Sequence, residues 1–278
     1  MLWGAIVGDI VGSIYEFDNI KAKDFPLFSP CGFITDDSCM TIAVADALLK
    51  WRHDGGDLSD LARRSMRAIG RQFPEKSYGF RFARWLDGYD SEPYDSWGNG
   101  AAMRVSAAGW VGRSLSEVKR LSYMVTSVSH DHIEAIKGAE ATAVAVFLAR
   151  TSHDKAEIGR HIIKNYYGAC LSVSELQKSY CWDSSCQGTV PQALQCFIES
   201  TDFEDAIRNA ISIGGDSDTI AAITGAVAGA YYGVPADIKA TARKYVPNTL
   251  LEIVERFEVV LPIQTQNATI SPHNSTIN

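Results

Sequence analysis

The chain has 278 residues, of which 46% are hydrophobic, and it carries a formal net charge of −7. This composition is typical of a globular protein with enough apolar side chains for a sizeable core. The negative charge leaves no broad basic surface for a nucleic acid or an anionic membrane. We therefore expect a substrate that is a small molecule or a protein, and a soluble cytoplasmic monomer.

The first apolar segment, residues 2–15, has some features of a secretory leader. It lacks a basic start and contains Asp9, so we interpret it as a helix of the mature protein. No other stretch is long enough to cross a membrane. The six cysteines are too sparse for a disulfide-stapled secreted module, and we expect free thiols.

Hydrophobic residues recur at helical spacing along almost the whole chain, and alternating strand patterns are nearly absent. Helices are predicted over residues 2–15, 40–49, 58–69, 103–108, 115–125, 133–150, 156–167, 191–199, 203–213, 218–232 and 236–258, the last with a break near Pro247. These segments predict an all-α fold, a single-domain orthogonal bundle of ten or more helices over residues 1–261. Residues 262–278 are polar and aperiodic and are predicted to form a disordered tail.

Two predicted helices carry glycines at every fourth position. Gly4, Gly8 and Gly12 form one row, and Gly225 and Gly229 form another. A glycine in a helix interior costs about 1 kcal/mol relative to alanine, so these rows require a compensating gain. Close contact between helix backbones would supply it.

The segment Thr35-Asp36-Asp37-Ser38 stands just before an apolar stripe that begins at Met40. This is the expected place for a helix cap and first turn. Aspartates there stabilise a helix by about 0.3 to 1 kcal/mol through its dipole. Capping alone would explain a single cluster of this kind.

A second cluster, residues 214–219, also precedes a long apolar helix. Asp216 and Asp218 stand two positions apart, about 200° around a helix, so their side chains converge only in a turn. Gly214 and Gly215 permit such a turn. The segment then offers carboxylates and hydroxyls with no lysine or arginine beside them.

If the two clusters meet, four carboxylates come together. That arrangement is unfavourable in a partly buried site unless cations neutralise the charge. Ligands that are all oxygen atoms favour Mg²⁺ or Mn²⁺ over zinc or copper. Two such ions would balance Asp36, Asp37, Asp216 and Asp218, and the pair could activate one water molecule. The sequence thus predicts a dinuclear metal site at the centre of the bundle.

Five separated motifs, in the same order, resemble the ADP-ribosylglycohydrolase family. They are Gly4 to Glu16, Thr35 to Ser38, Gly98 to Arg104, Ser129-His130 and Gly214 to Thr219. Several motifs in order are much more specific than any one of them. Ser38 departs from the threonine of many relatives but keeps a hydroxyl group.

The resemblance implies an all-α hydrolase with two Mg²⁺ or Mn²⁺ ions. The implied metal-binding residues are Thr35, Asp36, Asp37, Asp216, Asp218 and Thr219. The implied catalytic residues are Glu16, Asp37 and Asp218, and the implied substrate-binding residues are Gly98, Asn99, Gly100, Met103, Arg104, His130 and Ser217. Glu16 would lie near the scissile ribose, where it either activates water or holds a ribose hydroxyl.

Residues 98–104 and His130 also have simpler interpretations. A Gly-Asn-Gly sequence is most often a turn, although backbone N–H groups there could bind a diphosphate or ribose. Arg104 would add charge to that site or pair with an internal carboxylate. His130 would contact ribose or phosphate, or face water at a helix start, while His132 is expected to be structural or exposed at the rim.

The implied reaction is hydrolysis of the bond that joins ADP-ribose to an acceptor on a protein or a small conjugate. Arginine is the first expectation for the acceptor, by its frequency in the family. One alternative is a protein that binds ADP-ribose without turnover, and intact Glu16 and aspartates argue against it. Another is a two-metal phosphoesterase, which would release AMP rather than ADP-ribose.

Overall fold

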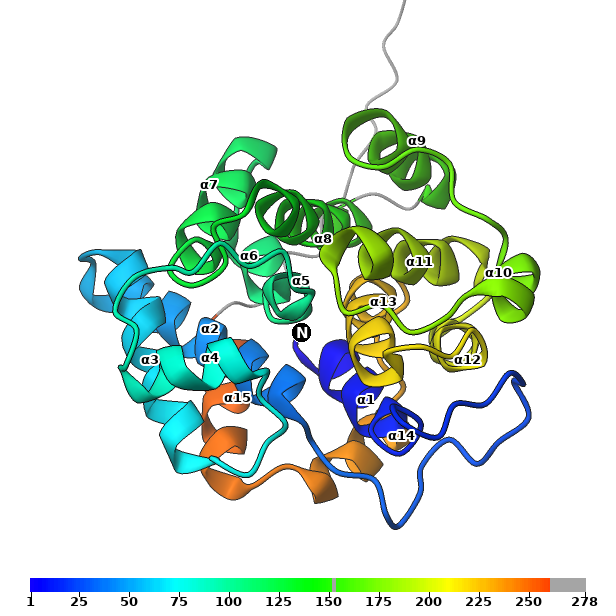
Figure 1. Ribbon diagram of the computed structural model, residues 1–278, viewed down its shortest axis with the longest axis horizontal. Coiled ribbons are helices and arrows are strands. Elements are labelled where there is room, and N and C mark those ends of the chain that lie inside the picture. The colour runs from blue at the N-terminus through cyan, green and yellow to red at the C-terminus, as the bar shows by residue number, and fades with distance from the viewer. Residues whose placement is uncertain (152–153, 261–278) are drawn as a thin grey trace, which may run out of the picture.

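The computed structural model describes residues 1–151 and 154–260, so the predicted tail lies outside the described residues. The helices (Figure 1) are α1 Trp3–Gly12, α2 Asp36–Asp54, α3 Leu58–Gln72, α4 Phe80–Asp87, α5 Gly100–Met103, α6 Ser106–Val111, α7 Leu115–Thr126, α8 Ile133–Thr151, α9 Lys155–Asn165, α10 Val173–Ser179, α11 Cys186–Glu199, α12 Phe203–Ser212, α13 Ser217–Tyr231, α14 Ala236–Ala242 and α15 Asn248–Val260, with the 3₁₀ turn Arg243–Tyr245 between the last two. These residues contain no strand, only an isolated bridge between Gly98 and Ser185. The all-α prediction is confirmed.

Several helix boundaries differ from those predicted. The first helix ends at Gly12 rather than Tyr15, because the Ser13 hydroxyl donates to the carbonyl of Ile10 and accepts from the N–H of Phe33. Helix α11 begins five residues before Pro191, with Ser185 as its cap. The predicted helix over 103–108 is two short helices, α5 and α6. The short helices α4 and α10 were not predicted.

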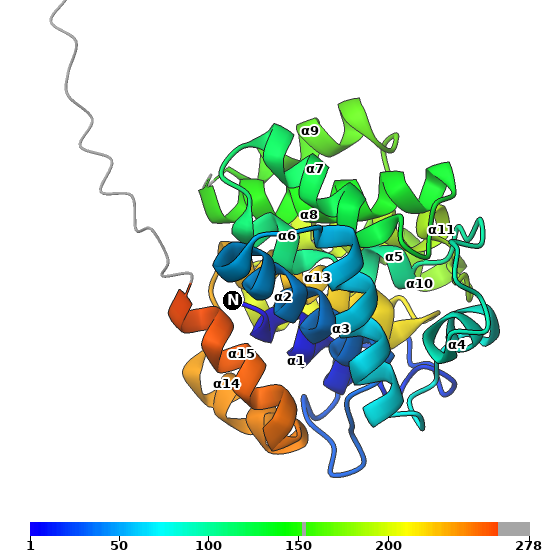
Figure 2. The same cartoon turned by 90° about the vertical axis from the view of Figure 1, so that its left-hand side faces the viewer.

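The core is built around α1 and α13, which lie side by side near the middle of the molecule in Figure 1. All ten residues of α1 are buried. Helices α8 and α11 pack on α13 from one side, and α2 with α3 closes another face (Figure 2). No helix within residues 1–151 and 154–260 combines the length and apolar character needed to cross a membrane.

Glycine is required where α1 crosses α13. A Cβ atom at Gly8 would lie 2.0 Å from the carbonyl oxygen of Ala221, and one at Gly4 would lie 2.1 Å from that of Gly225. At Gly12 it would lie 2.3 Å from the Cα of Asp218. The two backbones are therefore in direct contact and antiparallel, and the contact brings the end of α1 to the start of α13.

Candidate metal centre

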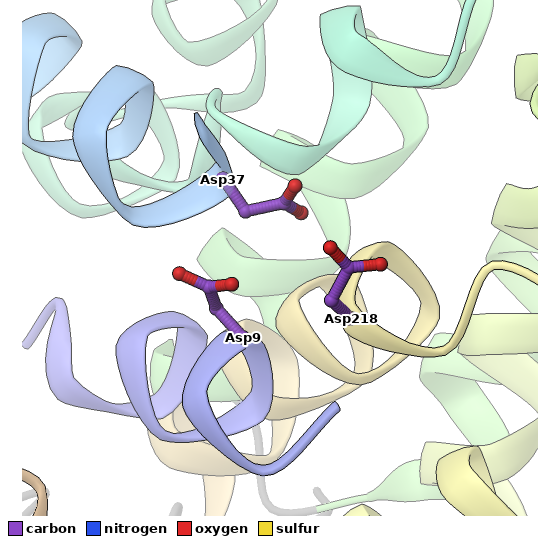
Figure 3. Close-up of side chains that lie close together, drawn as sticks. All are labelled: Asp9, Asp37 and Asp218. Carbon is purple, nitrogen blue, oxygen red and sulfur yellow. The ribbon is translucent and has the colours of Figure 1, made fainter. Parts of the chain in front are cut away.

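Three buried aspartates from three different helices converge at the α1–α13 contact. Asp9 comes from α1, Asp37 from the first turn of α2 and Asp218 from the first turn of α13. Figure 3 shows their carboxylates pointing toward one another, and an oxygen of each lies within 4.8 Å of an oxygen of the others. The two clusters separated by about 180 residues in the sequence thus meet, as the sequence predicted.

A second group of carboxylates adjoins the first. Glu16, Asp216 and Asp218 also offer oxygen atoms within 4.8 Å of one another. Asp218 belongs to both groups. Two adjacent sets of three carboxylates with one shared member form an arrangement that can hold two cations.

The carboxylates are poorly compensated by the protein itself. No ion pair among residues 1–151 and 154–260 includes any of them. One oxygen of Asp37, Oδ1, is buried without a hydrogen-bond partner. The N-termini of α2 and α13 point their positive dipole ends at the cluster and offset only part of the charge.

These surroundings raise the pKa of every member of the cluster. Burial, followed by the charge of Asp218, raises the pKa of Asp37 well above its usual range, and burial followed by Asp216 does the same for Asp218. Burial and the charges of Asp218 and Asp9 raise the pKa of Glu16 to about 8. Protons or cations must therefore neutralise the cluster at neutral pH.

Hydrogen bonds fix the orientation of the carboxylates. Asp9 accepts from the N–H of Thr35 (3.0 Å), the hydroxyl of Thr35 (2.7 Å) and the N–H of Ser38 (3.0 Å). The Thr219 hydroxyl donates to Asp37 Oδ2 at 3.2 Å. The bonds to Asp9 attach the start of α2 to α1, and the bond from Thr219 attaches α13 to α2, so a threonine hydroxyl of each acidic motif contacts a carboxylate.

A pocket of about 400 Å³ opens beside the carboxylates. Its walls include most of the predicted site residues, namely Glu16, Asp36, Asp37, Gly98, Asn99, Gly100, Met103, Arg104, His130, Asp216, Asp218 and Thr219. Asn99 links residues 98–104 to the carboxylate cluster, because its amide donates to Asp216 Oδ2 at 2.7 Å. Asp36 is less buried than Asp37 and belongs to neither group of three.

Two predicted site residues are not in the pocket wall. Ser217 is fully buried and its hydroxyl donates to the carbonyl of Gly215, so the structure does not present it to a substrate. Its first-turn position in α13 turns it away from Asp218, the next residue. Thr35 lies behind the carboxylates, where its hydroxyl donates to Asp9.

Arg104 and His130 form a buried chain on the other side of the pocket. Arg104 Nη2 donates to Ser129 Oγ (2.8 Å), and this oxygen lies 2.9 Å from His130 Nδ1. Because arginine only donates, the hydroxyl accepts from it and directs its own hydrogen to Nδ1. Burial and the Arg104 charge lower the pKa of His130 well below its usual value, so the ring is neutral and carries its hydrogen on Nε2.

Arg104 itself makes no ion pair with a carboxylate in the part of the chain that the structure describes. Its guanidinium lies 5.2 Å from the ring centre of Phe82, and its Nε and Nη1 atoms are buried without hydrogen-bond partners. Burial lowers its pKa to about 10, which still leaves it charged at neutral pH. It therefore acts on the pocket through its charge and through Ser129 and His130.

Comparison with known proteins is consistent with this geometry. The sequence profile of the ADP-ribosylglycohydrolase family matches residues 1–267. The chain belongs to the ADP-ribosylglycohydrolase family.

Relatives of this ADP-ribosylglycohydrolase family member are distant but span most of its length. The human ADP-ribosylhydrolase ARH3 is 25% identical over 84% of this chain and 84% of its own. The ADP-ribosylarginine hydrolase Tri1 of Pseudomonas putida is 26% identical over 84% of this chain and 70% of its own. A solved structure titled ADP-ribosylglycohydrolase-related protein complex is similar in fold, with a TM-score of 0.65, 24% identity, and coverage of 94% and 93% of the two chains.

The sequence interpretation missed Asp9 as a member of the site in this ADP-ribosylglycohydrolase family protein. It treated Asp9 only as a charge that argues against a leader peptide. A lone aspartate in a fully apolar helix, between Gly8 and Gly12, was the available signal, because a buried carboxylate needs a partner. Glu16 was placed beside the reaction, and the structure also puts it within reach of a cation.

Proposed function

We propose that this chain hydrolyses the glycosidic bond between ADP-ribose and an acceptor, with two Mg²⁺ or Mn²⁺ ions bound at Asp218. The proposal rests on the position of Asp218, which both groups of carboxylates share. This residue belongs to two groups of three carboxylates, which lie in the wall of a pocket in a protein of the ADP-ribosylglycohydrolase family. The acceptor is on a protein or a small conjugate.

The donor set fits hard divalent cations. Asp9, Asp37 and Asp218 would hold one ion, and Glu16, Asp216 and Asp218 would hold the other. All the donors are oxygen atoms, and the unpartnered Oδ1 of Asp37 is available as a ligand. When bound, the ions supply positive charge and Lewis acidity at this end of the pocket.

The residues of the pocket divide the reaction between them. A water molecule attacks the anomeric carbon, a carbon–oxygen bond forms, and the bond to the acceptor breaks with its electron pair going to the acceptor atom. Glu16, in the pocket wall at the carboxylate cluster, would lie beside this carbon, and its carboxylate would accept a proton from the attacking water, while the acceptor atom takes a proton from solvent. The surrounding aspartates stabilise the positive charge that develops on the ribose.

The opposite side of the pocket suits the diphosphate. Gly98 and Gly100 face His130, since a Cβ at Gly100 would lie 3.4 Å from His130 Nε2 and one at Gly98 would lie 3.7 Å from it. The absence of side chains there leaves room for a ligand next to this ring. The Nε2–H group donates to a phosphate oxygen, and the Arg104 charge behind it attracts the anion.

Product analysis tests the proposal. Purified protein with Mg²⁺ or Mn²⁺ is incubated with ADP-ribosylated peptides and with free ADP-ribose, and the products are separated by chromatography. Release of ADP-ribose with unmodified peptide is expected. Release of AMP would indicate a phosphoesterase, and binding without any product would indicate a protein that only recognises ADP-ribose.

We also propose a cytoplasmic location for this activity. All six cysteines are free thiols, among them the exposed Cys31 and Cys181. Thiols of this kind persist in a reducing compartment.

A further inference from the structure

The loops before α5 and α11 pair with each other in the wall of the pocket. The N–H of Asn99 donates to the carbonyl of Ser184 (2.8 Å), and the N–H of Cys186 donates to the carbonyl of Trp97 (2.9 Å). The isolated antiparallel bridge lies between these two bonds. The pairing holds the backbone of Asn99 in place, but it does not fix the side chain, which has two rotatable bonds of its own.

Thr189, near the start of α11, contacts that side chain. It is fully buried, and its hydroxyl has two hydrogen-bond partners. Oγ1 donates to the carbonyl of Asp183 at 3.0 Å and accepts from Nδ2 of Asn99 at 3.1 Å. A hydroxyl has one hydrogen, and here the carbonyl takes it, so only lone pairs face Asn99. Thr189 can therefore accept from the amide but cannot donate to it.

The hydroxyl of Thr189 determines which way the amide of Asn99 faces. Nδ2 uses both of its hydrogens, one for Thr189 Oγ1 and one for Asp216 Oδ2, at 2.7 Å from the latter. If the amide turned by 180°, its oxygen would face a carboxylate and a hydroxyl whose hydrogen is already used, and it would find no donor. Thr189 thus favours the orientation in which Asn99 donates to Asp216.

The bond from Asn99 acts on one of the two groups of carboxylates. Asp216 belongs to the group with Glu16 and Asp218 and not to the other. Burial raises the pKa of Asp216 to about 6, and its hydrogen bonds with Asp218 and Asn99 act in the opposite direction. A hydrogen-bond partner of this kind orients a carboxylate for a metal ion, and its loss typically weakens metal affinity about 10- to 100-fold.

We infer that Thr189 positions Asp216 through the amide of Asn99 and thereby strengthens the binding of one of the two cations. That cation is the one held by the group that contains Glu16. The inference rests on the proposed function, because it requires two bound cations. It adds a positioning residue that lies outside the pocket wall and touches neither the carboxylates nor the substrate.

Calorimetric titration of the metal-free protein with Mn²⁺ tests this role in Thr189→Val, which keeps the branched shape of threonine and removes its hydroxyl. We expect two bound ions in the unmutated protein. In Thr189→Val the Kd of one ion should rise about tenfold, the equivalent of one hydrogen bond, and the Kd of the other should not change. Thr189→Ser keeps the hydroxyl and should restore the affinity.

Thr224→Val is the matched control for the loss of a buried hydroxyl. Thr224 lies on α13, is also fully buried, and donates to the carbonyl of Ala193 on α11 at 2.9 Å. Both valine variants should lose unfolding free energy, measured by chemical denaturation, but only Thr189→Val should lose Mn²⁺ affinity. Equal weakening in the two variants, or of both ions in Thr189→Val, would indicate a general packing effect and overturn the inference.

A double-mutant cycle shows whether Thr189 acts through the amide. In an Asn99→Ala background, Thr189→Val should cause no further loss of Mn²⁺ affinity, because the group that the hydroxyl orients is absent. A second, additive loss would contradict the inference. If Thr189→Val does not fold, Thr189→Cys takes its place and is compared with Thr189→Ser. The two differ in one atom, and the serine variant should bind the ion more tightly because sulfur is a weak acceptor.

The failure of the proposed function gives a different result. If the unmutated protein binds fewer than two Mn²⁺ ions, the two-cation site is wrong and the role of Thr189 is wrong with it. If two ions bind and Thr189→Val changes neither Kd, only the role of Thr189 is wrong. If the Kd values change as expected but ADP-ribosylated peptides are not cleaved, the proposed hydrolysis is wrong and the role of Thr189 is confirmed.

Discussion

Asp218 has the most connected position in the site. It stands in the first turn of α13, lies within reach of four other carboxylates, and contacts the backbone of Gly12 through its own Cα. Burial and Asp216 hold its pKa well above the usual range. An ion bound on either side of it would remove this penalty, so metal affinity and turnover should both depend on its charge.

Replacing Asp218 by asparagine removes one charge from both groups of carboxylates and keeps the side-chain size. We expect turnover to fall by at least about 100-fold, with weaker Mn²⁺ binding, because loss of a ligand exceeds the usual effect of its supporting contacts. Calorimetry with Mn²⁺ and a hydrolysis assay measure the two effects. Asp237→Asn, on the surface of α14, is the matched control, and normal metal binding by Asp218→Asn would contradict the shared-ligand arrangement.

His130 offers a test of a single hydrogen position. The chain from Arg104 through Ser129 predicts that the neutral ring carries its hydrogen on Nε2, and ¹⁵N NMR of the imidazole reports this directly. Ser129→Ala removes the donor to Nδ1 and should shift the ring toward a mixture of tautomers. KM should then rise about fivefold, the equivalent of one lost hydrogen bond, with little change in kcat. A wild-type ring with its hydrogen on Nδ1 would refute the assignment.

At the level of elements, the contact between α1 and α13 decides where the carboxylates lie. Two helices with side chains at the crossing would be separated by several more ångströms. The glycines at the crossing remove that spacing, and Asp9 and Asp218 come within reach of the same ion. The glycine rows therefore serve the metal site as well as the core.

Gly8→Ala tests this link between packing and metal binding. The added Cβ would lie 2.0 Å from the carbonyl oxygen of Ala221, so the helices must separate. We expect a loss of unfolding free energy of about 1 to 3 kcal/mol together with weaker Mn²⁺ binding. Chemical denaturation and calorimetry measure the two. Gly168→Ala, where a Cβ meets no atom within 4 Å, should leave both unchanged. Intact metal affinity in a destabilised Gly8→Ala protein would show that the packing of α1 on α13 does not control metal binding.

At the level of the whole molecule, the acidic cluster links stability to pH and to divalent cations. The folded protein holds Glu16 at a pKa of about 8 and keeps the pKa values of Asp36, Asp37 and Asp218 well above their usual range. A raised pKa means that the folded state binds more protons than the unfolded chain above the ordinary carboxylate range. The metal-free protein therefore loses this stability as pH rises through those values.

We expect the Tm of the metal-free protein to fall between pH 6.5 and 9, and Mg²⁺ to raise it most at the upper end of that range. Thermal unfolding with EDTA and with excess Mg²⁺ measures this effect. The Met1 amino group and the His130 ring have lowered pKa values, which make stability rise with pH. The slope of Tm against pH is therefore compared between the unmutated protein and Asp218→Asn. A steeper fall in Asp218→Asn than in the unmutated protein would contradict the electrostatic account.

The helical class, the two acidic clusters and the close contact implied by the glycine rows could all be predicted from the sequence. Each of these follows from spacing within a short segment, where side chains three or four residues apart share a helix face. Recognition of five ordered motifs added Glu16, residues 98–104 and His130. The short helices α4 and α10 were not predicted, because the hydrophobic periodicity of about two turns is too short to detect.

The three-dimensional structure was needed to show which distant residues share the site. In the structure Asp9 lies close to Asp218, Asp218 belongs to two groups of carboxylates, and the Ser217 hydroxyl points away from the pocket. Phe17 also stacks on Trp182, a pair separated by 164 intervening residues in the sequence. These relations depend on how close α1 and α13 approach and on hydrogen bonds between loops, and no pattern within one segment encodes such distances.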